Sequence, residues 1–88
     1  MNVRIDKSFE RDINKIKDNK LIGKIADIIE QVQACSDHRE INNLKKLKGN
    51  HRYYRIRIGA YRIGLFIEEN TVDFIRVLPR KDIYKYFP

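Results

Sequence analysis

Apolar residues in the first part of the chain recur at helical spacing. Phe9, Ile13 and Ile16 lie four and three residues apart, which places them on one face of a helix that has Ser8 as its N-cap and ends near Asn19. The short polar break at residues 18–20 separates this helix from a second one and predicts an antiparallel helix pair. The apolar positions of the second helix repeat at spacings of three and four up to about Gln33, and they are Leu21, Ile22, Ile25, Ile28, Ile29 and Val32.

The remaining pattern predicts strands. Residues 2–6 alternate around Val3 and Ile5, which indicates a short strand before the helices. Residues 41–48 form a basic connector with room for one helical turn. Three later segments are rich in Tyr, Ile, Val, Phe and Arg and are joined by loops of hairpin length, and these segments are Arg52–Ile58, Tyr61–Ile67 and Thr71–Leu78.

The order of these elements defines a fold class. Pro79 ends the last strand because it has no N–H to offer a neighbouring strand, and Arg80 to Phe87 has room for about two helical turns. The resulting order is β-α-α-β-β-β with a short C-terminal helix. It predicts a single α+β domain over residues 1–88, in which two N-terminal helices pack on one face of a mainly antiparallel four-stranded sheet.

Composition excludes several classes of protein. The chain has 88 residues, of which 42% are apolar and 35% are charged, so it suits one modest core and is too apolar for wholesale disorder. No apolar run approaches the ~20 residues of a membrane-spanning helix, and the N-terminus lacks an apolar stretch of signal-peptide length. The single cysteine, Cys35, cannot form an internal disulfide, so we expect a cytoplasmic location.

Positive charge is concentrated in the middle of the chain. The formal net charge is +7, and no Asp or Glu lies between Ile41 and Ile67. A basic segment of this kind predicts an anionic partner, which composition alone leaves open as RNA, DNA, an acidic membrane face or an acidic protein. The cations of the segment are Lys45, Lys46, Lys48, Arg52, Arg55, Arg57 and Arg62.

Strand alternation brings several arginines together. Arg55 and Arg57 point away from the helices on one strand, Arg62 does so on the next, and Arg80 follows the last strand closely enough to join them. Guanidinium groups bind phosphate through paired hydrogen bonds, so the cluster predicts a phosphate site. An alternative stays open, because arginines on an open sheet face also keep it soluble. Aromatic residues near the cluster could stack on bases, and they are Tyr53, Tyr84, Tyr86 and Phe87.

A metal site is a weaker interpretation. Cys35, His38 and His51 offer three possible ligands, whereas a closed site usually needs four. Their neighbours are mostly Lys and Arg. We therefore expect neither a metal nor a cofactor.

Three motifs in the second half of the chain form a recognisable pattern. They are Leu47-Lys48-Gly49, then Tyr54-Arg55-Ile56-Arg57-Ile58-Gly59-Ala60-Tyr61-Arg62, then Arg80-Lys81-Asp82-Ile83-Tyr84. Together they resemble the RelE/ParE superfamily, the toxins of prokaryotic toxin–antitoxin pairs. The order and length of the N-terminal elements also fit, so the resemblance covers nearly the whole chain.

The resemblance implies a function. RelE-like toxins are metal-independent endoribonucleases that enter the ribosomal A site and cut mRNA, where the 2′-hydroxyl attacks the adjacent phosphorus and leaves a 2′,3′-cyclic phosphate. The implied partners are the ribosome, mRNA and a small antitoxin whose acidic segment covers the basic groove or displaces the C-terminal helix; no membrane partner is implied. By position, the implied catalytic residues are Arg55, Arg57, Arg62, Arg80 and Tyr84, and the implied RNA contacts are Lys45, Lys46, Lys48, Arg52 and Tyr53.

Two positions depart from the family pattern. Some relatives carry Lys where this chain has Arg55 and Arg57, and some carry His where it has Pro79. Arginine stays protonated in proteins and is a poor base. Tyr84 and His51 remain as candidate proton carriers, and positioning can supply much of the rate. The missing base leaves open a catalytically weak RelE-like protein that acts mainly in an autoregulatory antitoxin complex. The ParE branch of the same superfamily implies a second alternative, a DNA gyrase inhibitor, although such a protein does not need this set of arginines.

Overall fold

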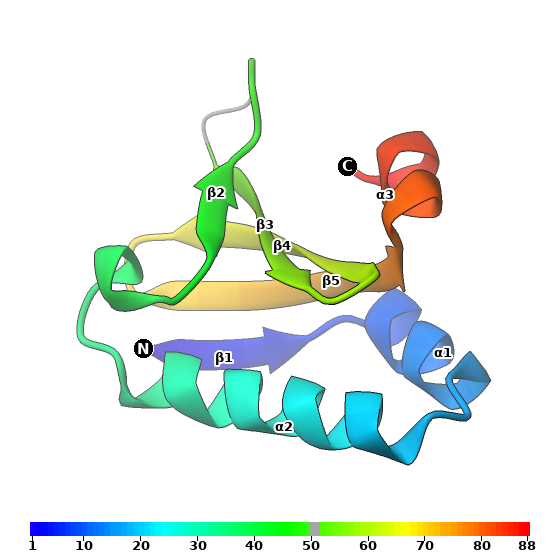
Figure 1. Ribbon diagram of the computed structural model, residues 1–88. Helices are drawn as coiled ribbons and strands as arrows, with labels where there is room; N and C mark the ends of the chain where they lie inside the picture. Colours follow the sequence, from blue (N-terminus) through cyan, green and yellow to red (C-terminus); the bar gives the residue numbers. More distant parts are fainter. Residues whose placement is uncertain (50–51) are drawn as a thin grey trace.

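The structure, a computed structural model, describes residues 1–49 and 52–88. It confirms the α+β class: α1 and α2 pack on one face of a five-stranded sheet, and α3 lies on the other (Figure 1). Within the described ranges no helix is long and apolar enough to cross a membrane. In chain order the elements are β1 (Asn2–Ile5), α1 (Lys7–Lys15), α2 (Asn19–Ala34), a 3₁₀ turn (His38–Glu40), β2 (Leu44–Lys46), β3 (Tyr53–Ile58), β4 (Tyr61–Glu68), β5 (Thr71–Pro79) and α3 (Arg80–Tyr86).

The sheet is antiparallel except at one edge. Its strand order is β1-β5-β4-β3-β2, and only β1 runs parallel to its neighbour, β5. The predicted meander of three strands is present as β3, β4 and β5. Gly59, in the tight β3–β4 turn, has a φ of 58°, a left-handed conformation that glycine adopts without steric strain from a Cβ atom.

The edge of the sheet beyond β3 differs from the prediction. The predicted connector at residues 41–48 contains β2, which pairs with β3 so that Leu44 lies opposite Ile56 and Lys46 opposite Tyr54. Leu44 packs against the core. The segment is too short for its own sequence pattern to predict a strand, so its conformation is determined by these tertiary contacts. The predicted four-stranded sheet therefore has a fifth strand.

The helix starts are fixed by aspartates. Asp6, and not the predicted Ser8, is the N-cap of α1, because its carboxylate accepts the Ser8 backbone N–H at 3.1 Å. This helix ends at Lys15, earlier than predicted. Asp18 caps α2 by accepting the backbone N–H groups of Lys20 and Leu21. Such caps satisfy amide groups that the first helical turn leaves without partners.

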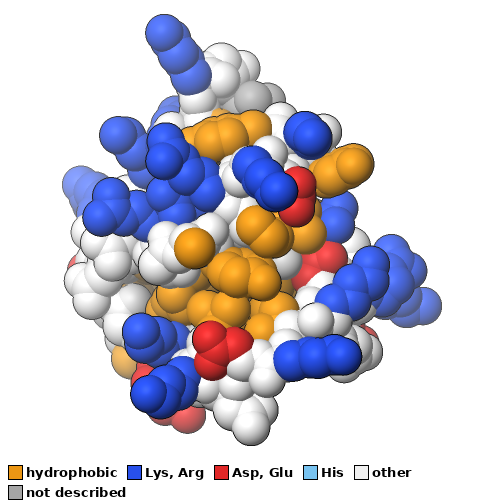
Figure 2. Space-filling view, turned by 45° about the vertical axis from the view of Figure 1, so that its right-hand side comes forward, with side chains coloured by type: hydrophobic (Ala, Val, Ile, Leu, Met, Phe, Trp, Pro, Cys, Tyr) orange, Lys and Arg blue, Asp and Glu red, His pale blue; other side chains and the backbone are white. Residues whose placement is uncertain are grey.

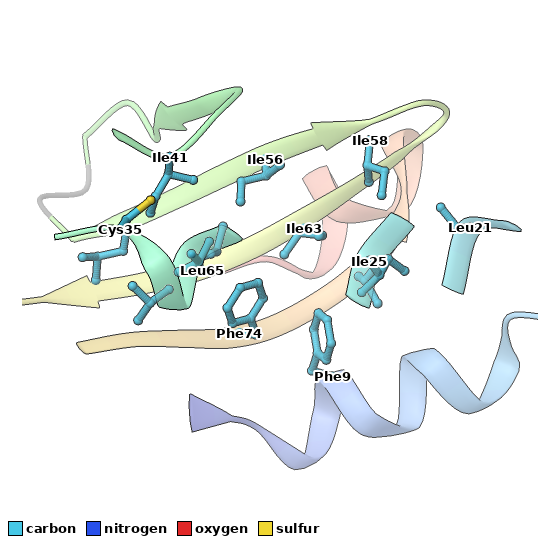
Figure 3. Close-up of a cluster of buried hydrophobic side chains, with 14 residues drawn as sticks. Phe9, Leu21, Ile25, Cys35, Ile41, Ile56, Ile58, Ile63, Leu65 and Phe74 are labelled. Carbon is cyan, nitrogen blue, oxygen red and sulfur yellow. The ribbon is translucent and has the colours of Figure 1, made fainter. Parts of the chain in front are cut away.

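The core lies between the sheet and the pair α1–α2 (Figure 3). Phe9 of α1 and Phe74 of β5 pack edge to face, with ring centroids 5.6 Å apart. Ile25 of α2 faces Ile63 of β4 across the same layer. On β3 and β4 the side chains that face this layer are buried or packed against it, and the arginines predicted to point away from the helices lie on the opposite face. The buried ones are Ile56, Ile58, Ile63, Leu65 and Ile67, and the partly buried ones are Tyr54 and Tyr61.

A buried ion pair ties α1 to β5 where β1 no longer covers that strand. Asp12 of α1 is 4% exposed and accepts hydrogen bonds from Arg76 Nε at 2.7 Å and Arg76 Nη2 at 3.1 Å. It also accepts the Val77 backbone N–H at 3.0 Å. A single carboxylate thus satisfies a charged side chain and an otherwise unpaired strand amide.

Candidate functional site

A pocket of about 520 Å³ lies on the sheet face opposite α1 and α2, between the β2–β3 side and α3. All five residues predicted from the sequence to be catalytic line it. Its full lining is Asn43, Leu44, Lys45, Arg55, Arg57, Arg62, Arg80 and Tyr84. We call it the arginine pocket.

Strand pairing explains why these cations meet. Arg57 of β3 lies directly opposite Arg62 of β4, and Arg55 lies opposite Lys45 of β2. Directly opposed residues share a face of the sheet with Cβ atoms roughly 5 Å apart. Arg80, the first residue of α3, is fixed beside them because its backbone N–H donates to a carbonyl oxygen of the β3–β4 turn at 2.9 Å.

Acidic side chains do not neutralise the arginine pocket. Within residues 1–49 and 52–88, no ion pair includes one of its arginines. Figure 2 shows Lys and Arg side chains crowded in the upper half of the molecule, the half that carries β2 and α3 in Figure 1. Because neighbouring like charges repel, the pocket favours a bound anion. The observed pairs join Arg4 to Asp73, Arg39 and His38 to Asp37, Arg52 to Glu68, and Arg76 to Asp12.

Arg62 is the buried member of the pocket, with 8% of its surface exposed. Its Nη1 donates to the carbonyl oxygens of Gly59 at 2.9 Å and Tyr61 at 2.8 Å, which leaves the donors on Nε and Nη2 available to a ligand. Burial, followed by the charge of Arg80, lowers the pKa of Arg62. The group remains a cation, because arginine is not deprotonated in proteins. An anion in the pocket would therefore offset both the cost of burying the Arg62 charge and its repulsion by Arg80.

Tyr84 brings an aromatic ring and a polarised hydroxyl to the pocket. Arg55 Nη1 donates to Tyr84 Oη at 2.7 Å, and Tyr84 as a whole is 57% exposed. The guanidinium of Arg80, one turn earlier on α3, and then that of Arg55 lower the pKa of the Tyr84 phenol, because both stabilise the charged phenolate. The ring is accessible for stacking, while its oxygen is held beside two guanidinium groups.

We expect the Tyr84 phenol to ionise at a pH below the usual range for tyrosine, and Arg80→Ala to raise its pKa. The reason is that Arg80 stabilises the charged phenolate, so its loss favours the protonated form. The measurement is a pH titration of ¹³Cζ-labelled tyrosines by NMR, with the Tyr84 signal assigned from Tyr84→Phe. Lys81→Ala, which removes an exposed cation outside the pocket, serves as the control. A Tyr84 titration that neither Arg80→Ala nor Arg55→Ala shifts would contradict this electrostatic account.

Only one of the basic residues predicted to contact RNA lines the arginine pocket. Lys45 lines the arginine pocket, whereas Lys46, Lys48 and Arg52 are exposed and lie outside its lining. Arg52 Nη1 is 3.1 Å from Glu68 Oε2 at the far end of the hairpin. These three residues stay predictions as contacts to RNA outside the pocket.

Tyr53, the aromatic member of the predicted RNA contacts, packs against other aromatic rings. Its ring packs edge to face on Phe66 and on Phe87, with centroids 5.1 Å and 5.6 Å apart. It does not line the pocket. Its contact with RNA stays a prediction.

Two pocket residues were missed in the sequence. Asn43 and Leu44 line the pocket immediately before and within β2, and Asn43 has a φ of 61°. Only recognition of β2 as a strand would have placed them there. Of the three side chains considered for a metal, Cys35 is buried with its thiol donating to the Gln31 carbonyl oxygen at 3.1 Å, and His51 lies outside the described residues.

Comparison with known proteins gives a consistent family. Residues 3–84 match the family model described as the ParE toxin of the type II toxin–antitoxin system parDE. The chain is 42% identical over 89 residues to Toxin RelE3 of Methanocaldococcus jannaschii, with full coverage of both chains.

Solved structures agree in fold. A chain in the crystal structure of the RelB-RelE antitoxin–toxin complex from Methanococcus jannaschii is 40% identical, with a TM-score of 0.81 over 97% of this chain and 99% of that one. A chain of the RelBE2 toxin–antitoxin complex from Mycobacterium tuberculosis has a TM-score of 0.71 over 90% and 96% of the two chains, at 21% identity. The latter likeness is one of fold alone.

Proposed function

Since the chain belongs to the RelE/ParE family of toxins from type II toxin–antitoxin systems, we propose that it is a ribosome-dependent endoribonuclease. It cuts mRNA in the A site, without a metal, and thereby inhibits translation in the cytoplasm. The observation that carries this proposal is the arginine pocket: four guanidinium groups, Lys45 and an exposed tyrosine ring around one cavity. A phosphate group flanked by a base fits that combination of charge and aromatic surface.

The proposed reaction breaks one bond to phosphorus and forms another. The 2′-oxygen of the mRNA attacks the adjacent phosphorus as the bond to the 5′-oxygen breaks, which yields a 2′,3′-cyclic phosphate and a free 5′-hydroxyl. Negative charge grows on the phosphate oxygens in between. Arg57, Arg62 and Arg80 are already positioned around the pocket, so their charge stabilises this state with little reorganisation.

Proton transfer is the demanding part of this mechanism. The 2′-hydroxyl must lose a proton and the leaving 5′-oxygen must gain one. Among the described residues that line the pocket there is no His, Asp or Glu, and arginine does not release its proton. Lys45 and Tyr84 are the lining side chains that can exchange one, and Tyr84 has the lowered pKa that favours its charged form.

A cognate antitoxin is the proposed protein partner. The solved relative from Methanococcus jannaschii is a complex of RelE with RelB. An acidic segment of such a partner would complement the arginine pocket. A second available surface is an apolar groove of about 330 Å³ between α1 and α2, whose lining includes Phe9, Ile13, Ile22 and Ile29. An amphipathic partner segment could bury these side chains.

Primer extension on a reporter mRNA in a reconstituted translation system tests the proposal. We expect new 3′ ends at A-site codons when the protein is added, and no cleavage of the same mRNA without ribosomes. Intact mRNA on translating ribosomes, with folded protein present, would refute the nuclease.

A gyrase inhibitor is the second candidate, because the matching family model is that of the ParE toxin. In this case the arginine pocket would be a protein-binding surface. A DNA supercoiling assay on the same preparation separates the two, since a gyrase inhibitor blocks supercoiling and leaves mRNA intact.

The absence of a pocket His or carboxylate among the described residues supports a third candidate, a weak toxin that acts mainly in an autoregulatory antitoxin complex. That candidate is inactive in both assays.

A further inference from the structure

The helix α3 carries two residues of the arginine pocket but has little stability of its own. It is seven residues long, Arg80 to Tyr86, and its N-cap Pro79 makes no side-chain capping bond. Isolated helices of this length are unstable in water. The position of Tyr84 therefore depends on what holds α3 against the sheet.

Two apolar side chains hold it. Ile83 is 3% exposed and Phe87 is 8% exposed, whereas Tyr84 and Tyr86 project into solvent. The first residue of α3 is also fixed to the β3–β4 turn by its backbone N–H. Phe87 is thus the contact that restrains the far end, beyond Tyr84.

The ring of Phe87 packs directly against Gly64, and we call this contact the seat of Phe87. A Cβ atom at Gly64 would lie 2.7 Å from the Cγ, Cδ1 and Cε1 atoms of the Phe87 ring, closer than carbon atoms approach, so only glycine lets this ring lie directly on β4. Gly64 is directly opposite Arg55 in the sheet and shares its face with Arg62, two residues earlier. Tyr53 packs edge to face against the same ring. The seat therefore lies next to the pocket arginines.

We propose that Phe87 is a positioning residue: its seat on Gly64 fixes α3 so that Tyr84 stays in contact with Arg55 inside the arginine pocket. Phe87 is not among the side chains that line the pocket, so it acts through α3. Its effect on mRNA cleavage rests on the proposed nuclease function. Its effect on the position of Tyr84 does not.

Phe87→Ala tests this first without any ribosome. We expect the Tyr84 signal in the ¹³Cζ titration to move to a higher pKa, because the phenol leaves Arg55 and Arg80. Phe87→Leu retains an apolar group on the seat and should restore most of the shift. Tyr86→Ala, an exposed neighbour on the same helix, should leave the Tyr84 titration unchanged. All titrations are made well below the thermal midpoint of each variant, so that a change reports on α3 and not on global unfolding.

A double-mutant cycle identifies the contact. Gly64→Ala places a methyl group where the ring lies, so it should shift the Tyr84 titration as Phe87→Ala does. If both act through the same seat, the double variant should show no more than the larger single effect. Additive shifts, or a Phe87→Ala titration identical to that of the unmodified chain, would overturn the proposal. Should Phe87→Ala not fold, Gly64→Ala carries the same test, with Phe87→Leu as the variant that should keep the titration of the unmodified chain.

The second arm uses programmed ribosomes. We expect Phe87→Ala to lower kcat by about 10- to 100-fold with little change in KM, because misplacing a reacting group by about 1 Å has effects of that size. An unmodified chain that does not cleave mRNA would remove the nuclease proposal, while the NMR titrations would still decide the role of Phe87. An active unmodified chain with normal kcat in a Phe87→Ala variant would overturn the inference alone.

Discussion

Arg80→Ala is expected to lower the rate of mRNA cleavage on the ribosome by about 10²- to 10³-fold, the size of effect found when one preorganised donor is removed from a developing negative charge. Arg80 lies at the start of α3, lines the arginine pocket and is exposed, so its side chain contributes little to folding. Growth inhibition by the expressed protein should weaken in parallel. Single-turnover primer extension measures the rate, and thermal unfolding confirms that the variant is folded.

The matched control is Lys81→Ala on the same helix. It removes the same unit of charge from an exposed position outside the pocket, so cleavage should stay close to that of the unmodified chain. Arg62→Ala is a less clean test, because Arg62 also binds two backbone carbonyl oxygens of the β3–β4 turn. A folded Arg80→Ala protein that still binds its antitoxin and remains fully toxic would refute the site assignment.

Asp12→Ala is expected to have the largest effect on stability, a loss of about 3 kcal/mol in the free energy of unfolding. Removing one partner of a buried pair leaves the other charge uncompensated. Here the loss of the Asp12 carboxylate would leave two groups without a partner: Arg76, whose side chain is three-quarters buried, and the Val77 backbone N–H. Urea denaturation followed by circular dichroism measures the change.

Arg4→Ala supplies the comparison for that experiment. Arg4 Nε lies 2.6 Å from Asp73 Oδ1, but the Arg4 side chain is 73% exposed. We therefore expect Arg4→Ala to have a much smaller effect than Asp12→Ala, because water and salt screen an exposed pair. Equal losses in the two variants would show that the burial of Asp12 does not determine its contribution.

The fold was predictable where a pattern is long or repeated. The apolar spacing of α2 and the alternation along β3 and β4 place all three elements within one or two residues of their observed bounds. β2 was missed because three residues carry too little pattern and its conformation depends on pairing with β3. The start of α1 was misplaced because Asp6 and Ser8 are both good N-cap residues, and only their geometry distinguishes them.

The grouping of the pocket arginines was predictable from the sequence, whereas the burial of one of them was not. Alternation places Arg55, Arg57 and Arg62 on one face, and the structure brings them together in one pocket. It does not predict that Arg62 is buried, since that depends on the backbone of the turn and on α3. For the same reason the contact between Tyr53 and Phe87 was not predictable, because no local sequence pattern determines where the C-terminal ring packs.

The uncompensated charge of the arginine pocket also links folding to ligand binding. In the unfolded chain Arg57, Arg62 and Arg80 are hydrated and far apart, whereas the folded chain holds them together with Arg62 buried. Folding without an anion therefore works against charge repulsion and desolvation. A polyanion that binds only the folded chain adds stability by mass action, about 2.7 kcal/mol at a concentration 100 times its Kd. The arginines that stabilise a charged transition state thus make the folded protein less stable when the pocket is empty than when an anion is bound. This is a trade-off between activity and stability.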